Sequence, residues 1–324
     1  MDALTIIKLV AGFVLLFCGG EVLVRGSVSL ARRLQVSPFL IGATVIAFGT
    51  SAPELVVSLK AAFDDAMGIA LGNIVGSNIA NLLLILGLAA LFAPVVVNLG
   101  AVLRDSLALA AASLLLTLFV AMGEITRWQG GLMFVLLAAL IVYSYWSERR
   151  RVTPAGEKTG GGEETEQPEL QHKVTTALVF VVAGLASVAF GAHLLVEAAV
   201  MVARGIGMSE AVIGLTVVAV GSSLPELATS IVAAYRKHAD VALGNVIGSS
   251  VFNILGILGL VSVIHPIAAP HEIAVFDIWI MLGVTALVLT PVFAGIRIGR
   301  PLGGFFVLLY AGFITVQYLG FLKP

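Results

Sequence analysis

The feature that most constrains this chain is a polar motif that lies inside apolar sequence and occurs twice. In the first copy, residues 41–88, the carboxylate Glu54 ends IGATVIAFGTSAPE, and LGNIVGSNIANLLLILGL follows. The second copy, residues 213–260, contains IGLTVVAVGSSLPEL and LGNVIGSSVFNILGILGL, and its Glu226 follows Glu54 by 172 positions. About half of the aligned positions are identical, so the chain contains an internal repeat.

The composition places both copies in a membrane protein. The 324 residues are 59% hydrophobic and only 11% charged, with a mean hydropathy of +1.08, far from the values of soluble domains. The net charge of −1 does not suit a nucleic-acid-binding protein. A spanning helix needs about 20 apolar residues, so a chain of this length can hold on the order of ten. We therefore expect an all-α polytopic membrane protein.

Ten apolar segments are spaced along the chain, five on each side of one polar stretch. This stretch, residues 148–173, is rich in Gly, Glu and Lys, a composition typical of a flexible linker. We predict ten transmembrane helices in two five-helix repeats, residues 1–147 and 174–324, with the motif in the second and third helices of each. The segments lie near residues 4–24, 38–62, 67–92, 102–121, 128–146, 174–200, 210–234, 239–264, 273–293 and 302–320.

The basic residues divide unequally between the two sides of such a ten-helix arrangement. Most of them, including the run from Arg149 to Arg151, fall on the side that carries the linker. The positive-inside rule then places the linker in the cytoplasm and both termini outside the cell membrane. Because each half has an odd number of helices, the second half enters the membrane in the opposite sense. The sequence thus predicts inverted repeats, an architecture typical of secondary transporters.

The motif offers hard oxygen ligands at membrane depth. Gly49 and Pro53 weaken the helix there, and proline removes a backbone donor, which should free carbonyl groups such as that of Ala47. Such irregular backbone is tolerated in a membrane only where it is buried in protein or lines a watery cavity. Together with the Thr50 and Ser51 hydroxyls and the carboxylate, these groups suit Ca²⁺, Na⁺ or Mg²⁺ better than zinc or copper.

Four-residue spacing aligns these groups on helix faces, because side chains at i and i+4 share a face. If a pseudo-two-fold axis relates the repeats, the faces converge near the midplane and the two glutamates face each other. The four sets are Thr50, Glu54 and Ser58; Asn73, Ser77 and Asn81; Ser222, Glu226 and Ser230; and Asn245, Ser249 and Asn253.

The neutral residues and the glutamates call for different interpretations. Ser, Thr and Gly in membrane helices commonly serve packing, and a lone Asn often bonds a neighbouring helix. A charge at the bilayer centre costs at least ~2.5 kcal/mol and therefore faces a cavity or a partner. Since no basic residue recurs at a matching depth in both halves, a bound cation is the simplest compensation for Glu54 and Glu226.

The quoted motifs identify a resemblance. GTSAPEL with GNIVGSNIANLLL, and GSSLPEL with GNVIGSSVFNILG, resemble the paired alpha-repeats of the cation/calcium exchanger superfamily, in its prokaryotic sodium/calcium exchanger branch. The resemblance covers most of the chain outside the linker. It implies ten transmembrane helices and antiport of Ca²⁺ against Na⁺ by alternating access, with the Ca²⁺ site built by Glu54 and Glu226.

The resemblance also implies roles for other residues. The helices near 4–24 and 174–200 would slide across a rigid core. Some members carry an acid at one of the two central amide positions, where this chain has Asn twice, so the Na⁺ stoichiometry and proton sensitivity stay open. The implied ligands are the hydroxyls of Thr50, Ser51, Ser222 and Ser223, the flanking sodium-site groups of Ala47, Ala219, Ser77 and Ser249, and the central amides of Asn81 and Asn253.

Polar pairs also occur in the two helices that would slide. Glu21 and Arg25 are four apart, and His193 and Glu197 hold the equivalent positions in the second half. We interpret them as local pairs at the membrane edge. A role in gating or ion entry is the alternative.

Other functions remain open at this stage. An exchanger of the same fold could couple Ca²⁺ to H⁺ or also move K⁺, and a passive cation channel could use mid-membrane carboxylates as a filter. The motifs hold no catalytic constellation, so we expect neither an enzyme nor a cofactor. The expected partners are the lipid bilayer and the transported ions, with no nucleic acid and no obligatory protein partner.

Overall fold

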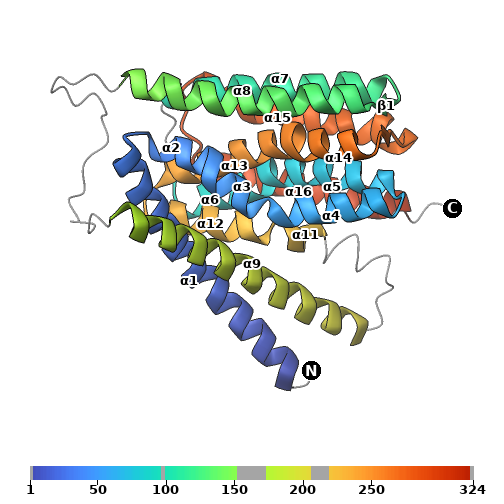
Figure 1. The fold of residues 1–324 in the computed structure, drawn as a ribbon. Coiled ribbons are helices and arrows are strands. Elements are labelled where there is room, and N and C mark those ends of the chain that lie inside the picture. Colours follow the sequence, from blue (N-terminus) through green and yellow to red (C-terminus); the bar gives the residue numbers. More distant parts are fainter. Residues whose placement is uncertain (1–2, 96–98, 152–172, 206–218, 322–324) are drawn as a thin grey trace.

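The computed structural model describes residues 3–95, 99–151, 173–205 and 219–321, and these are almost entirely helical (Figure 1). The first half contains α1 (Ala3–Leu34), α2 (Pro38–Ile41), η1 (Gly42–Ile46), α3 (Ala47–Thr50), α4 (Ala52–Phe63), α5 (Met67–Ile79), η2 (Ala80–Ile85), α6 (Leu86–Phe92), α7 (Leu99–Ala121), β1 (Glu124–Ile125) and α8 (Arg127–Arg151). The second half contains α9 (Val174–Gly205), α11 (Ala219–Ser222), α12 (Leu224–Tyr235), α13 (Ala239–Val251), η4 (Phe252–Leu258), α14 (Gly259–Ile264), β2 (Ile267–Ala268), η5 (Ile273–Asp277), α15 (Ile278–Phe293) and α16 (Arg300–Phe321). The η elements are π-helical turns that continue the α-helices beside them.

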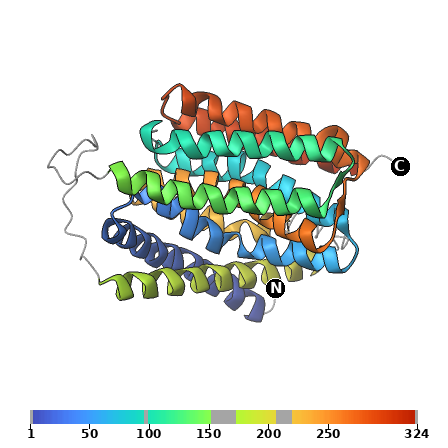
Figure 2. The ribbon, with the colours of Figure 1, turned by 45° about the horizontal axis from the view of Figure 1, so that its top comes forward.

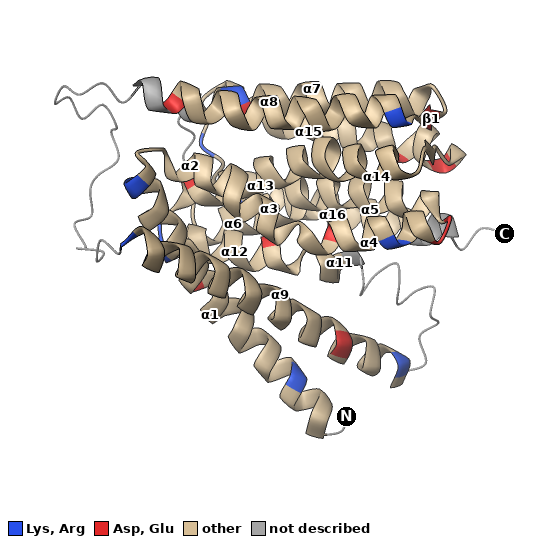
Figure 3. Cartoon of the chain, in the orientation of Figure 1, with Lys and Arg blue, Asp and Glu red and all other residues tan. Residues whose placement is uncertain are grey.

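Within the described ranges, eight helices are long and apolar enough to cross a membrane. A ninth candidate is the bent pair of residues 38–50 and 52–63, with an angle of 44° between its parts. The expected segment 210–234 lies partly outside the described residues, which resume at residue 219. Charged residues gather toward the helix ends and are sparse between them (Figure 3). The chain is therefore a multi-pass membrane protein.

The two motif-bearing helical hairpins form the centre of the bundle. The apolar windows of residues 67–92 and 239–264 are each 78% buried, against 22% for residues 127–148 and 11% for residues 300–317. Side chains such as Ile74, Ile79 and Ile254 are fully enclosed. The less buried helices α8 and α16 present large apolar side chains at the surface, as lipid contact requires.

The long helices α1 and α9 lie side by side on one face of this core (Figures 1 and 2). Small residues let their backbones approach, a common device in membranes. A Cβ atom added to Gly184 would lie 2.6 Å from the backbone nitrogen of Leu23, and one added to Gly12 would lie 2.9 Å from the carbonyl oxygen of Gly191. The two helices therefore pack as one closely fitted pair.

The sequence underestimates the length of this pair. The expected segments near 4–24 and 174–200 are helices of 32 residues each in the structure. The apolar pattern ends at Arg25, but the helix continues because its polar residues find partners, with Arg25 donating to Glu21 at 2.5 Å.

Short backbone bridges join the two halves at both ends of α7. Beyond one end, Glu124 and Ile125 pair with Ala268 and Ile267 in an antiparallel ribbon. Before the other end, Val95 and Ile298 exchange two backbone hydrogen bonds of 2.9 and 3.0 Å. These bridges hold the loops of the two halves together at both ends of the bundle.

Candidate functional site

The breaks in the two motif helices place the carboxylates at helix starts. Ser51, with φ −82° and ψ 6°, separates α3 from α4, and Ser223 separates α11 from α12 with nearly the same angles. A proline follows two residues later in each copy, in the first turn, where its missing N–H costs no helical hydrogen bond. Glu54 and Glu226 therefore lie in the first turns of α4 and α12, where the helix dipole favours negative charge.

The structure brings the two glutamates into one buried site, each only 1% exposed. The Ser51 hydroxyl donates to Glu226 Oε1 at 2.9 Å. The Ser223 hydroxyl donates to Glu54 Oε1 at 3.1 Å. Because Ser223 is the repeat equivalent of Ser51, the contacts are reciprocal: each half bonds the carboxylate of the other.

Four buried oxygens of this region have no hydrogen-bond partner among the described residues. They are Oε2 of Glu54 and of Glu226, and Oδ1 of Asn81 and of Asn253. Neither carboxylate takes part in an ion pair within the described part of the chain. A buried carboxylate without a counter-charge is expensive. Two carboxylates with unsatisfied amide oxygens are the donor set that hard cations prefer.

The structure does not confirm one expectation about the backbone. The carbonyl of Ala47 is not freed by Pro53, because it accepts from the Ser51 backbone N–H at 3.0 Å. It also accepts from the Thr50 hydroxyl at 3.4 Å. The reason is the spacing between Pro53 and Ala47. A proline removes the donor for the carbonyl four residues earlier, which here is that of Gly49.

The remaining predicted ligands lie along the same broken helices. Thr50 and Ser77 are buried at the end of α3 and within α5, and Ser249 is buried within α13. Asn81 and Asn253 are each the second residue of a π-helical turn, η2 and η4 respectively. Asn253 donates to Asn78 Oδ1 at 3.4 Å. In α11, Ala219 is the first residue and Ser222 the half-buried last one, and the Ala219 side chain lies outside the described part.

Two residues without a predicted ligand role also contact the site. Asn73 donates to the Glu54 carbonyl at 3.3 Å and to Ser58 Oγ at 3.0 Å. In the second half, Asn245 donates to the Glu226 carbonyl at 3.4 Å and to Ser230 Oγ at 3.0 Å. Their place in the four-residue pattern indicated proximity to the glutamates. Each amide bridges the backbone carbonyl of a glutamate and a serine hydroxyl, an arrangement that we call a backbone clamp. This role could only be read from the way the helices pair.

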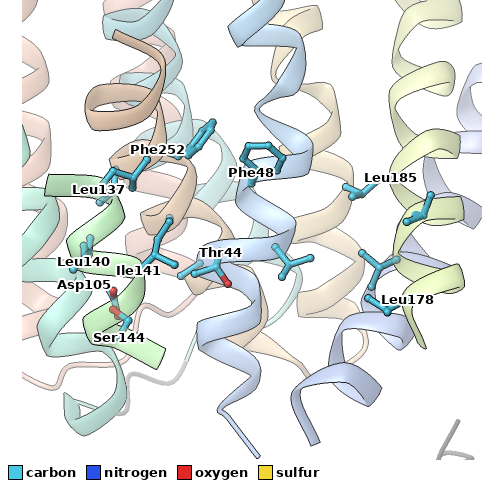
Figure 4. Close-up of a pocket in the computed structure, with 16 residues that line it drawn as sticks. Thr44, Phe48, Asp105, Leu137, Leu140, Ile141, Ser144, Leu178, Leu185 and Phe252 are labelled. Atoms are coloured by element: carbon cyan, nitrogen blue, oxygen red, sulfur yellow. The ribbon is translucent and has the colours of Figure 1, made fainter. Parts of the chain in front are cut away.

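A separate cavity of about 440 Å³ lies beside this site (Figure 4). Thr44 and Phe48 line one wall, Leu140 and Ile141 of α8 another, and Leu185 of α9 a third. Almost all of its lining is apolar, and neither motif glutamate contributes to it. The cavity is therefore distinct from the carboxylate site and does not offer an ion-binding donor set.

The fold and the site together define a polytopic membrane protein that holds two carboxylates between equivalent broken helices. The sequence model of the family described as "Sodium/calcium exchanger protein" matches residues 4–146 and 176–319. The chain belongs to the sodium/calcium exchanger family, a family of transporters and not of enzymes. The resemblance drawn from the motifs is thereby confirmed.

Full-length relatives agree with this assignment. The sodium/calcium exchanger MaX1 of Methanosarcina acetivorans is 30% identical over 353 residues, which cover 98% of this chain and 99% of the relative. The inner membrane protein YrbG of Escherichia coli is 32% identical over 317 residues, covering 98% and 97%. A solved structure of the sodium-calcium exchanger NCX_Mj superposes with a TM-score of 0.82 at 32% identity, over 98% of this chain and 100% of that one.

Proposed function

We propose that this protein is a secondary active antiporter that exchanges Ca²⁺ for Na⁺ across the cell membrane. The observation that carries the proposal is the pair of buried glutamates. Each is bonded by a serine of the other half, and each has one oxygen without a partner among the residues that the structure describes. Membership of the exchanger family and the names of MaX1 and NCX_Mj support Ca²⁺ and Na⁺ as the ions.

In this proposal, Glu54 and Glu226 share one Ca²⁺. Calcium takes six to eight oxygen ligands at about 2.3–2.6 Å, so neutral oxygens must complete its shell. The described residues contain no cluster of three or more His, Cys, Asp or Glu side chains, which leaves hydroxyl, amide and carbonyl oxygens for this purpose. The hydroxyl ligands are those of Thr50, Ser51, Ser222 and Ser223; the flanking sodium sites use Ala47, Ala219, Ser77 and Ser249; and Asn81 and Asn253 lie at the central level.

Exchange follows from the charge of the site. Two ionised glutamates attract either one Ca²⁺ or several Na⁺, and repulsion between the cations prevents both loads from binding together. The unloaded site carries two negative charges, and moving these through the membrane interior is costly. The protein therefore changes access only when loaded. If three Na⁺ exchange for one Ca²⁺, one charge crosses per cycle, worth ~2.3 kcal/mol per 100 mV.

The architecture that we propose for this cycle is ten helices in two inverted five-helix repeats. The repeat shift of 172 positions and the equivalent breaks at Ser51 and Ser223 support it. The linker, residues 148–173, is cytoplasmic and both termini are outside, as the basic loops indicate. The closely packed α1 and α9 lie on one face of the buried core, which suits movement of this pair as a unit during alternating access.

The test is flux through purified protein in proteoliposomes loaded with Na⁺. We expect Glu54→Gln and Glu226→Gln each to abolish Na⁺-driven ⁴⁵Ca²⁺ uptake, because each removes half of the charge that binds Ca²⁺. The matched control is Glu124→Gln, at an exposed position in β1, which should transport like the unaltered protein. Undiminished flux in either motif variant contradicts the proposal.

The same vesicles separate the alternatives. We impose Na⁺, K⁺ and H⁺ gradients one at a time at fixed Ca²⁺. Uptake driven by H⁺ alone, or requiring K⁺, assigns a different coupling ion to the same fold. Ca²⁺ flux without any counter-ion gradient indicates a channel.

A further inference from the structure

Asn245 connects the two halves of the site through one fully buried side chain. Its Nδ2 donates to two groups of its own half, the Glu226 carbonyl and Ser230 Oγ. Its Oδ1 accepts from the Thr50 hydroxyl of the first half at 3.3 Å and from Ser249 Oγ at 3.5 Å. The side chain has no solvent exposure, so water cannot replace any of these partners.

The chemistry of these partners fixes the orientation of the amide. A backbone carbonyl can only accept, so the NH₂ group must face Glu226 and the amide oxygen must face Thr50. An amide oxygen likewise only accepts, so the Thr50 hydroxyl must be the donor in this contact. Flipping the amide would set two acceptors against each other at the Glu226 carbonyl, where the distance is 3.4 Å.

This orientation matters because a hydroxyl that binds a cation must turn its hydrogen away from it. The hydrogen then needs an acceptor elsewhere, since an unpaired buried donor costs free energy. In the structure, the acceptors within reach of Thr50 are Asn245 Oδ1, the Ala47 carbonyl and the Glu226 carboxylate. The Ala47 carbonyl already accepts from the Ser51 N–H, and the Glu226 carboxylate is itself an ion ligand in the proposed function. Asn245 thus offers the acceptor that leaves the lone pairs of Thr50 free for an ion.

We propose that Asn245 is a positioning residue for ion binding, which orients the Thr50 hydroxyl across the repeat boundary. This inference deepens the proposed function and rests on it. Asn245 is not itself a ligand. It acts through Thr50, and through the clamp that its NH₂ group places on the backbone of Glu226.

The repeat supplies a matched control in Asn73, the equivalent residue of the first half. Its NH₂ group makes the same two contacts, with the Glu54 carbonyl and Ser58 Oγ. Both of these contacts stay within the first half and neither involves Thr50. Asn73→Leu therefore reports the loss of a clamp with the Thr50 acceptor intact, while Asn245→Leu reports the loss of a clamp together with the loss of that acceptor.

The experiment is a double-mutant cycle on Ca²⁺ binding by purified protein in detergent. The variants are Asn245→Leu, Asn73→Leu and Thr50→Val, with the pairs Thr50→Val/Asn245→Leu and Thr50→Val/Asn73→Leu. The readout is the shift of the thermal unfolding midpoint with Ca²⁺ concentration, which reports binding without any transport step. Elution as a single peak on size exclusion and the midpoint without Ca²⁺ report folding separately.

We expect Asn245→Leu to weaken Ca²⁺ binding about tenfold more than Asn73→Leu, as the loss of an interaction that supports a charged ligand set predicts. In the Thr50→Val background the two leucine variants should have equal effects. The proposal is overturned if they are equal in the unaltered background, if the difference persists without the Thr50 hydroxyl, or if Thr50→Val leaves binding unchanged. Failure of the proposed function would show instead as Ca²⁺ binding that is insensitive to Glu54→Gln and Glu226→Gln.

Discussion

Arg236 Nε donates to Glu21 Oε2 at 2.6 Å and so ties the end of α12 to α1. Glu21 also accepts from Arg25 one turn further along α1, which confirms the local pair expected from the sequence. On the other helix of the α1–α9 pair, Glu197 forms an ion pair with Lys8. Exposed ion pairs contribute only about 0–1 kcal/mol. The interest of Glu21–Arg236 lies in its position, because it joins the α1–α9 pair to the core.

The repeat predicts a counterpart of this contact at the opposite end of the bundle. A shift of 172 positions takes Glu21 to His193 and Arg236 to Asp64. The turns after α4 and α12 are equivalent as well, with Asp65 and Lys237 both at positive φ of 54° and 63°. If the α1–α9 pair moves against the core, the Glu21–Arg236 contact should open while His193 approaches Asp64.

Disulfide trapping tests this exchange of contacts in a Cys18→Ser background, which removes the free thiol. We expect Glu21→Cys/Arg236→Cys and Asp64→Cys/His193→Cys to crosslink under opposite ion gradients, and each crosslink to stop Ca²⁺ flux until it is reduced. Simultaneous crosslinking of both pairs in one molecule would contradict the prediction.

The crossed serine contacts should contribute equally to ion binding. Ser51→Ala and Ser223→Ala each remove the hydroxyl that bonds the opposite glutamate. We expect either change to weaken Ca²⁺ binding about tenfold, since hydrogen bonds to charged groups are worth about 1.5–3 kcal/mol. Isothermal titration with Ca²⁺ measures the effect. Ser250→Ala is the control, because among the described residues its buried hydroxyl bonds only the Val246 carbonyl of its own helix. A loss of equal size in this control would refute the interpretation.

An acid at the central amide position should make transport sensitive to protons. Asn253→Asp adds a carboxyl next to Asn78 Oδ1, which accepts from Asn253 at 3.4 Å. Protonation removes the added charge and the cation binding that depends on it. We therefore expect Ca²⁺ flux by this variant to fall as the pH is lowered, more steeply than flux by the unaltered protein. Flux assays at stepped pH with a fixed Na⁺ gradient check this, and identical pH profiles would rule it out.

The fit between α1 and α9 should be intolerant of added volume. A Cβ atom on Gly184 would lie within 2.7 Å of three atoms of Leu23, two of them backbone atoms that cannot move aside. We expect Gly184→Ala to destabilise the protein by about 1–3 kcal/mol, the usual cost of overpacking, seen as a lower unfolding midpoint in detergent. Gly131→Ala in α8 meets no atom within 4 Å and should not lower the midpoint, because alanine is favoured over glycine inside a helix.

The local features of the site were predictable because they depend on neighbouring residues. The helix break follows from Gly49 and Pro53, and the shared face of Glu54 and Ser58 follows from helical periodicity. The repeat itself identified Glu226 as the partner of Glu54. The expectation that Pro53 frees the Ala47 carbonyl was wrong, because the proline removes the donor for the Gly49 carbonyl and leaves the Ser51 N–H bonded to Ala47.

The sequence by itself determined the membrane class, the internal repeat, the two buried carboxylates and the family to which the chain belongs. Those properties reside in composition, in motif spacing and in the cost of charge in an apolar segment. Only the tertiary structure decided which atoms meet: Ser51 with Glu226, Thr50 with Asn245, and Arg236 with Glu21. These contacts join residues 175, 195 and 215 positions apart. They depend on how whole helices lie against one another, which neither helical periodicity nor local preference fixes.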